Sequence, residues 1–241
     1  MEPSCLLSFN ALNDMSRTFE ITASLICGVP LNLERSVRDI IGADIDMLHF
    51  DVMDGVCVPR FGLYPEILVG VRKLTDLPVD VHMMVTKPEP YIETYARAGA
   101  TIFYVHAENN INLHRTLKLI RDAGMKPGVV LNMATPLCVL DYILADIDYV
   151  LLMAINPGIV GHHIIDTIYR KIADVKTVLR ERAIKIVIDG GVTPESSAEM
   201  IRAGADVLVC GSSTIFRPGE GPLPELTKKF RRHVNAQLEE G

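Results

Sequence analysis

Histidine and aspartate residues that could share one site occur at three separate points of the 241-residue chain. His49 and Asp51 stand two residues apart, and His82 lies further along the chain. Asp189 precedes two glycines. Imidazole and carboxylate groups are common ligands of divalent transition metals, and carboxylates also act as general acids and bases. A single such residue is more often structural, but four together favour a metal site.

Each of these residues lies at or near the end of a short β-branched run. The eight expected strands are Ile21–Ile26, Asp46–Asp51, Val79–Met83, Thr101–His106, Pro127–Leu131, Tyr149–Met153, Lys185–Asp189 and Asp206–Cys210. The helical patterns between them are Leu33–Ile41, Pro65–Leu74, Pro88–Ala98, Leu113–Ala123, Leu137–Leu144, Ile168–Arg182, Glu195–Ala203 and Leu223–Leu238. Eight strands alternating with eight helices predict an α/β protein with a single (β/α)8 TIM barrel.

The length and the turn residues fit one barrel domain. A (β/α)8 barrel typically needs roughly 250 residues. We therefore expect a short N-terminal extension at residues 1–20 and a catalytic barrel at residues 21–241. Gly42, Gly99 and Gly204 each follow a helical pattern and precede a strand, where glycine can end a helix. A doubly wound open sheet is the alternative, but the segment Cys27–Pro30 lacks its glycine fingerprint.

The barrel geometry predicts that the histidines and aspartates meet. The C-terminal ends of all strands of a parallel barrel lie at one mouth. His49 and Asp51 share a face because side chains alternate along a strand, and His82 is on the neighbouring strand. Asp189 ends a strand across the ring. Three other aspartates are assigned to turns without a functional role, namely Asp46, Asp54 and Asp80.

The charge and cysteine content exclude several classes of protein. The formal net charge is −6 and no stretch is rich in lysine or arginine, which argues against nucleic acid or a membrane surface as the main partner. No apolar stretch is long enough to span a bilayer, and the N-terminus lacks a basic secretory signal. Five cysteines without a CxxC pair indicate neither a disulfide framework nor a zinc ribbon. We expect a cytoplasmic protein.

Six short segments resemble the signatures of the ribulose-phosphate 3-epimerase family, from about Ser24 to Phe216. They are His49–Gly55, Asp80–Val85, Val105–Glu108, Asn156–Gly158, Asp189–Val192 and Gly211–Ser212. The resemblance implies a metal-dependent isomerase that interconverts D-ribulose 5-phosphate and D-xylulose 5-phosphate in the pentose phosphate pathway. It also implies a homo-oligomer. His106 and Asn132 match the family as well, but no role in proton transfer is assigned to them.

The resemblance further implies how the site works. One divalent ion, which is zinc, iron(II), manganese or cobalt, is held by His49, Asp51, His82 and Asp189. Asp51 and Asp189 transfer protons on opposite sides of an enediolate. Ser24 matches a family serine found about 25 residues before the His-x-Asp pair, although Ala23 replaces the usual proline; Ser4 matches by letters but lies 45 residues away. The substrate-binding residues are Ser24, His82, Met53, Met84, Met153, Gly158, Gly161, Gly190, Gly191, Gly211 and Ser212.

Two loops depart from the family's usual pattern. Ile159–His163 has a valine at a usual glycine and two histidines in place of Gln-Ser, and Val56–Arg60 also differs. His162 and Arg60 are each either anion contacts or ordinary surface residues. The changes favour an altered choice of sugar phosphate over lost chemistry. An epimerase for D-allulose 6-phosphate is one alternative, and a non-catalytic sugar-phosphate-binding barrel is another. An orotidine-phosphate decarboxylase is disfavoured, because no lysine lies in the segment Phe50–Asp54.

Overall fold

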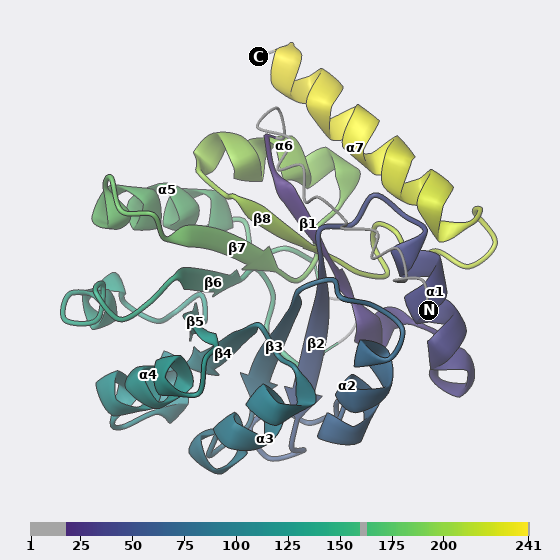
Figure 1. Ribbon diagram of the computed structural model, residues 1–241. Coiled ribbons are helices and arrows are strands. Elements are labelled where there is room, and N and C mark those ends of the chain that lie inside the picture. The colour runs from purple at the N-terminus through teal and green to yellow at the C-terminus, as the bar shows by residue number, and fades with distance from the viewer. Residues whose placement is uncertain (1–17, 160–162, 241) are drawn as a thin grey trace, which may run out of the picture.

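The strands form one closed parallel barrel in the computed structural model, which describes residues 18–159 and 163–240 (Figure 1). Each strand pairs with its sequence neighbours, and β8 pairs with β1 to close the ring. The strands are β1 (Glu20–Ser24), β2 (Met47–Met53), β3 (Val79–Met84), β4 (Ile102–His106), β5 (Lys126–Leu131), β6 (Tyr149–Met153), β7 (Lys185–Asp189) and β8 (Val207–Cys210). The predicted fold class is therefore confirmed.

Helices surround the barrel, and seven α-helices lie within the described ranges. They are α1 (Leu33–Ile41), α2 (Pro65–Arg72), α3 (Ile92–Ala98), α4 (Leu113–Asp122), α5 (Ile168–Leu179), α6 (Pro194–Ala203) and α7 (Leu223–Glu239). The expected helix at Leu137–Leu144 is wrong. That segment forms a 3₁₀ helix at Leu137–Leu140 and then turns closed by i→i+3 hydrogen bonds. So short a connection gains too few hydrogen bonds to offset the cost of nucleating an α-helix.

The first strand begins and ends earlier than expected. Glu20 already belongs to β1, and β1 stops at Ser24 because Leu25–Cys27 forms a 3₁₀ helix. Most of the expected extension, residues 1–17, lies outside the described residues. Phe19 is buried against Phe230 of α7, with the two rings edge to face at 6.3 Å between centroids. The barrel therefore starts at the first residues that the structure describes.

The core has two layers, because each strand of the barrel is buried on both faces. The outer layer lies between strands and helices and includes Phe50, Val81 and Phe103. The inner layer fills the barrel with Met47, Ile102, Tyr104, Val130, Tyr149, Leu151, Met153, Val187, Val207 and Val209. Polar side chains at the mouth therefore stand above a buried, largely apolar layer.

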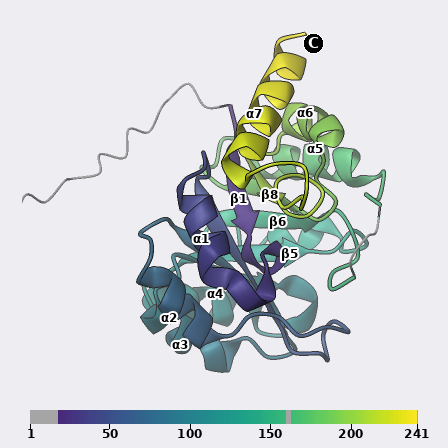
Figure 2. The same ribbon diagram turned by 90° about the vertical axis from the view of Figure 1, so that its right-hand side faces the viewer.

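The C-terminal helix closes the side of the barrel where the first and last strands meet. Figure 2 shows α7 lying beside α1 and α6. Arg231 of α7 is buried, and its guanidinium donates to the Phe19 carbonyl oxygen at 3.1 Å and pairs with Asp44 at 2.9 Å. It also pairs with Asp46, which accepts a hydrogen bond from the Ile21 N–H at 2.7 Å. Asp46 thus has the turn role that the sequence predicted.

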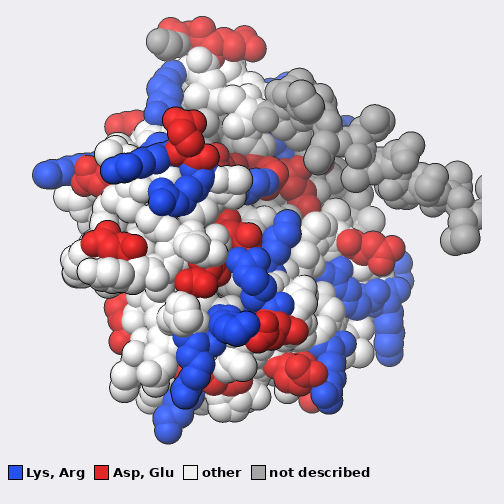
Figure 3. All heavy atoms as spheres, turned by 60° about the vertical axis from the view of Figure 1, so that its left-hand side comes forward, with Lys and Arg blue, Asp and Glu red and all other residues white. Residues whose placement is uncertain are grey.

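The surface carries both signs of charge. On the face drawn in Figure 3, Lys and Arg side chains are interspersed with Asp and Glu side chains. Exposed i,i+4 pairs on the helices include Glu34 with Arg38 and Glu93 with Arg97. Among the helices described, none has both the length and the apolar character that crossing a bilayer requires.

Gly128 of β5 tests the packing of the inner layer. A Cβ atom at this position would lie 2.1 Å from Cδ1 of Tyr104, which is itself fully buried. We expect Gly128→Ala to lower the free energy of unfolding by about 1–3 kcal/mol through overpacking, measured by urea denaturation. The control is Gly70→Ala in α2, where no atom lies within 4 Å. This change should stabilise the helix by about 0.5 kcal/mol, and equal effects at both positions would contradict the packing argument.

Candidate metal centre and active site

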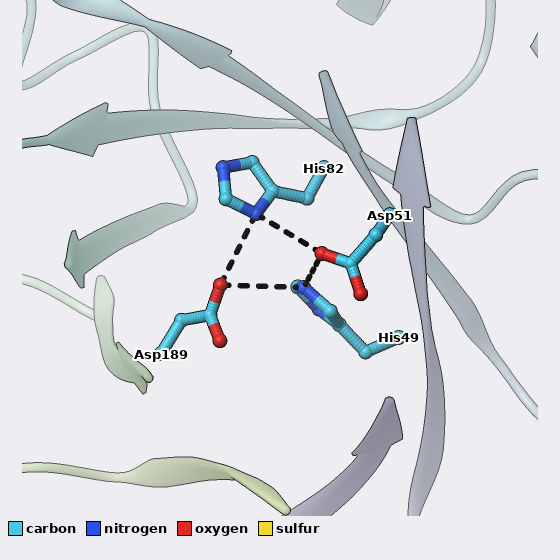
Figure 4. A group of neighbouring side chains, drawn as sticks. All are labelled: His49, Asp51, His82 and Asp189. Carbon is cyan, nitrogen blue, oxygen red and sulfur yellow. Dashed lines mark ion pairs between the residues drawn. The ribbon is translucent and has the colours of Figure 1, made fainter. Parts of the chain in front are cut away.

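The structure brings His49, Asp51, His82 and Asp189 together at the C-terminal mouth of the barrel (Figure 4). Parallel pairing of β2 and β3 places Asp51 directly beside His82. Asp189 is the last residue of β7 and reaches the same point from across the ring. One ligand atom from each residue lies within 4.8 Å of the other three. The convergence expected from the strand ends is therefore present.

Each inward imidazole nitrogen faces a carboxylate oxygen from both sides of the barrel. His49 Nε2 lies 3.2 Å from Asp51 Oδ1 and 3.6 Å from Asp189 Oδ2. His82 Nδ1 lies 3.7 Å from Asp51 Oδ1 and 3.2 Å from Asp189 Oδ2. Both nitrogens are buried and make no hydrogen bond of acceptable geometry. Buried polar atoms nearly always have a partner, so this arrangement fits a cation held between the four side chains.

The four residues shift one another's protonation. Burial alone would lower the pKa of His49, but the charges of Asp80 and Asp51 raise it well above its usual value. Burial likewise opposes the net rise in the pKa of His82, which Asp189 and Asp51 cause. For Asp51 and Asp189 burial would raise the pKa, whereas the two imidazoles lower it. These shifts favour the charged forms of both the imidazoles and the carboxylates, and a divalent metal would compete with the histidine protons.

Asp80 supports His49 from below the site. Asp80 is fully buried on β3, where it contacts His49 Nδ1 and accepts a hydrogen bond from Thr22 Oγ1 at 2.7 Å. Carboxylates in this position fix the orientation of metal-binding histidines. The assignment of Asp80 to a turn without a role is therefore wrong. Alternation along the strand places Asp80 and His82 on the same face, but only the pairing of β2 with β3 sets Asp80 beside His49.

His82 has its own support, which consists of His106 at the end of β4 and Glu108 just beyond it. His82 Nε2 lies 2.9 Å from His106 Nε2, and His106 Nδ1 lies 3.2 Å from Glu108 Oε2. Glu108 also accepts hydrogen bonds from the Asn132 N–H at 2.8 Å and from Thr135 Oγ1. Burial alone would raise the pKa of Glu108, but these hydrogen bonds together lower it to about 2. Burial lowers the pKa of His106, so its ring is neutral near pH 7.

Ser24 contacts the proposed proton-transfer residue Asp51. Ser24 is the last residue of β1 and is paired in register with His49. Its hydroxyl donates to Asp51 Oδ2 at 2.8 Å, while Asp51 Oδ1 faces the histidines. This position fits the choice of Ser24 over Ser4, which lies outside the described residues.

The three methionines separate into two groups. Met53 and Met84 are paired in register and pack with Val58 into a small apolar cluster. Met153 belongs instead to the inner layer of the barrel, although it is paired in register with Asp189. All three are buried. The structure thus places Met53 and Met84 together and Met153 next to the carboxylate across the ring.

The glycines expected to bind phosphate also allow loops to pack closely. Gly158, Gly190 and Gly191 all have positive φ angles, of 77°, 97° and 65°. A Cβ atom at Gly190 would lie 2.3 Å from the Ile155 side chain, and one at Gly158 would lie 2.5 Å from Val58. These three positions therefore require glycine for backbone reasons as well.

The remaining expected substrate residues lie after β8 or within the loop after β6. Gly211 lies beside the Cys27 side chain, and Ser212 is exposed directly after it. Gly161 and His162 lie outside the described residues. Arg60 is half-buried in the loop after β2.

Asp54 holds the loop that follows β2. Its Oδ1 accepts hydrogen bonds from the N–H groups of Val56 at 2.8 Å and Cys57 at 2.7 Å. Its Oδ2 accepts from the N–H and the hydroxyl of Thr86, just after β3. Burial alone would raise the pKa of Asp54, but these hydrogen bonds lower it to about 2. The predicted turn role of Asp54 is confirmed.

A closed parallel barrel that gathers two histidines and two aspartates at its mouth defines a barrel enzyme with a candidate metal site. The chain belongs to the ribulose-phosphate 3-epimerase family, whose family model matches residues 20–216. It is therefore an isomerase, and the resemblance drawn from the short segments is confirmed.

Individual relatives agree with this assignment. Ribulose-phosphate 3-epimerase of Bacillus subtilis is 45% identical over 184 residues, which cover 75% of this chain and 85% of the relative. The chloroplastic ribulose-5-phosphate-3-epimerase of Arabidopsis thaliana is 40% identical over 197 residues, which cover 80% and 70%.

Solved structures with low sequence identity support the fold alone. The structure of KGPDC from Streptococcus mutans has a TM-score of 0.71 at 12% identity and covers 91% of this chain and 99% of its own. Phosphoribosyl anthranilate isomerase from Thermus thermophilus has a TM-score of 0.64 at 15% identity and covers 90% and 100%.

The raised histidine pKa values predict how metal binding depends on pH. The pKa values of His49 and His82 lie above the usual 6.5, so protons compete with a metal for both imidazoles as the pH falls. We expect the Zn²⁺ association constant to rise by roughly tenfold between pH 6.5 and 7.5, measured by competition with a chromophoric chelator. His233→Gln on the exposed face of α7 should leave this profile unchanged, whereas His82→Gln should make it shallower, because only His49 would then exchange a proton for the metal. A pH-independent affinity in the wild type would contradict the site.

Proposed function

We propose that this protein is a metal-dependent 3-epimerase that interconverts D-ribulose 5-phosphate and D-xylulose 5-phosphate. The observation that carries the proposal is the position of Asp51 and Asp189. They come from opposite sides of the ring and place their oxygens within 4.8 Å of a shared group of ligand atoms. The names of the curated relatives support the choice of substrate.

The reaction needs two proton-transfer groups. A 3-epimerase removes the C3 proton on one face of the substrate and returns a proton on the other face. We assign these roles to Asp51 and Asp189, since β2 and β7 present them from opposite sides. Their lowered pKa values provide an ionised base, and its partner carries a proton only as the working acid. The Ser24 hydroxyl stabilises the ionised form of Asp51 by donating to Oδ2.

His49, Asp51, His82 and Asp189 would hold the metal. When bound, a divalent ion would stabilise the negative charge that develops on the substrate's ketone oxygen as the proton leaves. Two imidazoles and two carboxylates suit zinc, iron(II), manganese or cobalt. We propose a cytoplasmic location from the cysteine pattern and the N-terminal sequence, and a homo-oligomer from the family resemblance.

Other residues would shape the substrate pocket. We assign Met53, Met84 and Met153 to apolar walls that exclude water without donating a competing proton. Backbone N–H groups near Gly158, Gly161, Gly190, Gly191, Gly211 and Ser212 would bind the phosphate. Loops after β6, β7 and β8 carry these groups, and this end of a barrel is where phosphate sites commonly form.

A substrate screen tests the proposed activity. We expect the metal-loaded protein to epimerise D-ribulose 5-phosphate, followed by NMR of the sugar or by a coupled assay. D-allulose 6-phosphate and phosphate-free D-ribulose are the comparisons, and the free sugar should react far more slowly because phosphate contacts are missing. Turnover of D-allulose 6-phosphate without turnover of D-ribulose 5-phosphate would overturn the substrate assignment. Absence of turnover with both phosphates would favour a binding barrel without catalysis.

Asp189→Asn tests the assignment of two bases. We expect epimerisation to fall by roughly 10²–10⁴-fold, because one proton-transfer group is lost. Asp51 should still remove the C3 proton of one epimer, so at saturating Zn²⁺ that epimer alone should exchange its C3 proton with D₂O. Asp174→Asn on the exposed face of α5 is the matched control and should behave like the wild type. Retained epimerisation, or exchange of both epimers at equal rates, would refute the assignment.

A further inference from the structure

We infer that Glu108 and His106 are positioning residues that fix the tautomer of His82, so that its Nδ1 atom is free to bind a metal. The inference rests on the metal site proposed above. It concerns residues that do not touch the ion. Their arrangement forms one line of contacts, from His82 through His106 to Glu108.

The two metal-site histidines face the site with different nitrogens. His49 presents Nε2 and directs Nδ1 to the carboxylate of Asp80. His82 presents Nδ1 and directs Nε2 away from the site, where it meets Nε2 of His106. A carboxylate ion accepts hydrogen bonds and cannot donate one. Asp80 therefore requires the proton of His49 on Nδ1 and so determines the tautomer of His49 directly. A neutral histidine can either donate or accept, so the partner of His82 leaves its tautomer undecided.

Glu108 resolves this choice. The 2.9 Å separation between the Nε2 atoms of His82 and His106 requires one nitrogen to donate and the other to accept. Ionised Glu108 accepts from His106 Nδ1, so that nitrogen carries the proton and His106 Nε2 is the acceptor. His82 must then donate from Nε2. Its single remaining lone pair is on Nδ1, which is the atom that faces Asp51 and Asp189.

The hydrogen-bond donors around Glu108 determine which groups donate and which accept along this line of contacts. The second oxygen, Oε1, accepts from the Asn132 N–H and from the Thr135 hydroxyl. A backbone N–H cannot accept a hydrogen bond, so an acceptor is required at this end of the side chain. Lys171 of α5 is buried and donates to the carbonyl oxygens of Asn132 at 2.5 Å, Met133 at 3.0 Å and Thr135 at 2.8 Å. The loop that holds Glu108 is therefore itself held in place.

Glu108→Gln exchanges donor and acceptor at each hydrogen bond between residue 108 and His82, while the size of the side chain stays the same. The amide oxygen must face the Asn132 N–H, so the amide NH₂ faces His106 Nδ1. His106 then accepts at Nδ1 and donates from Nε2, and His82 must accept at Nε2. The proton of His82 moves to Nδ1, where it competes with a metal. We expect the Zn²⁺ affinity to fall roughly 10- to 100-fold, as for other changes behind metal-binding histidines.

The background variant His106→Phe separates this effect from the loss of one negative charge. Phenylalanine keeps an aromatic ring at position 106 but has no nitrogen that could donate or accept a hydrogen bond. The side chain at position 108 then can no longer determine the tautomer of His82. We therefore expect Glu108→Gln to change the Zn²⁺ affinity less than about twofold when Phe is at position 106. A simple charge effect would persist at full size in that background. Chelator competition measures the affinity of all four proteins, and circular dichroism checks that each is folded.

Nitrogen-15 NMR of the Zn²⁺-loaded wild type tests the inference without any variant. We expect His106 protonated at Nδ1 and unprotonated at Nε2, with the proton of His82 on Nε2. A proton on Nε2 of His106 would overturn the inference, as would an unchanged affinity in Glu108→Gln or an equal loss with Phe at position 106. A wild type that binds no Zn²⁺ would instead overturn the metal site, and the inference with it. If the variants fail to fold, the spectrum of the wild type decides.

Discussion

The architecture depends on keeping four ionisable side chains close together in a buried place. Two imidazoles and two carboxylates meet above the apolar inner layer, where an unpaired charge would be costly. The arrangement is tolerable because the charges of His49 and His82 offset those of Asp51 and Asp189. It persists because each ligand is on a strand of a closed ring, whose register cannot slip without moving every interior side chain to the other face.

Asp80 and Glu108 support the candidate metal-binding histidines from outside the group of four side chains. Asp80 and Glu108 are both acceptors, and each is held by donors that are part of the fold. Asp80 contacts its histidine directly, whereas Glu108 acts through His106. The difference follows from geometry, because His82 turns its Nε2 toward β4 and away from any carboxylate on β3. A neutral intermediate ring therefore links the carboxylate to the ligand.

The ligand set was predictable from the sequence because it depends on local features. Alternation along a strand places His49 and Asp51 on one face, and the strand-to-loop boundary marks Asp189. The role of Asp80 was missed because an aspartate near a strand start resembles a turn residue, and only the pairing of β2 with β3 sets it beside His49. The contacts of Glu108 depend on the turn after β5, where the Thr135 N–H donates to the Asn132 carbonyl oxygen, and the strand and helix patterns did not indicate this turn.

The loop after β2, which departs from the family pattern at Val56–Arg60, packs against the start of the loop after β6. Val58 follows β2 and Gly158 follows β6, yet a Cβ atom at position 158 would lie 2.5 Å from Val58 Cβ. Asp54 fixes the first loop, and the positive φ of Gly158 restricts the second. A change at Val58 therefore alters the surface against which Gly158 packs. The four candidate site residues, by contrast, are on strands that the closed barrel holds in register.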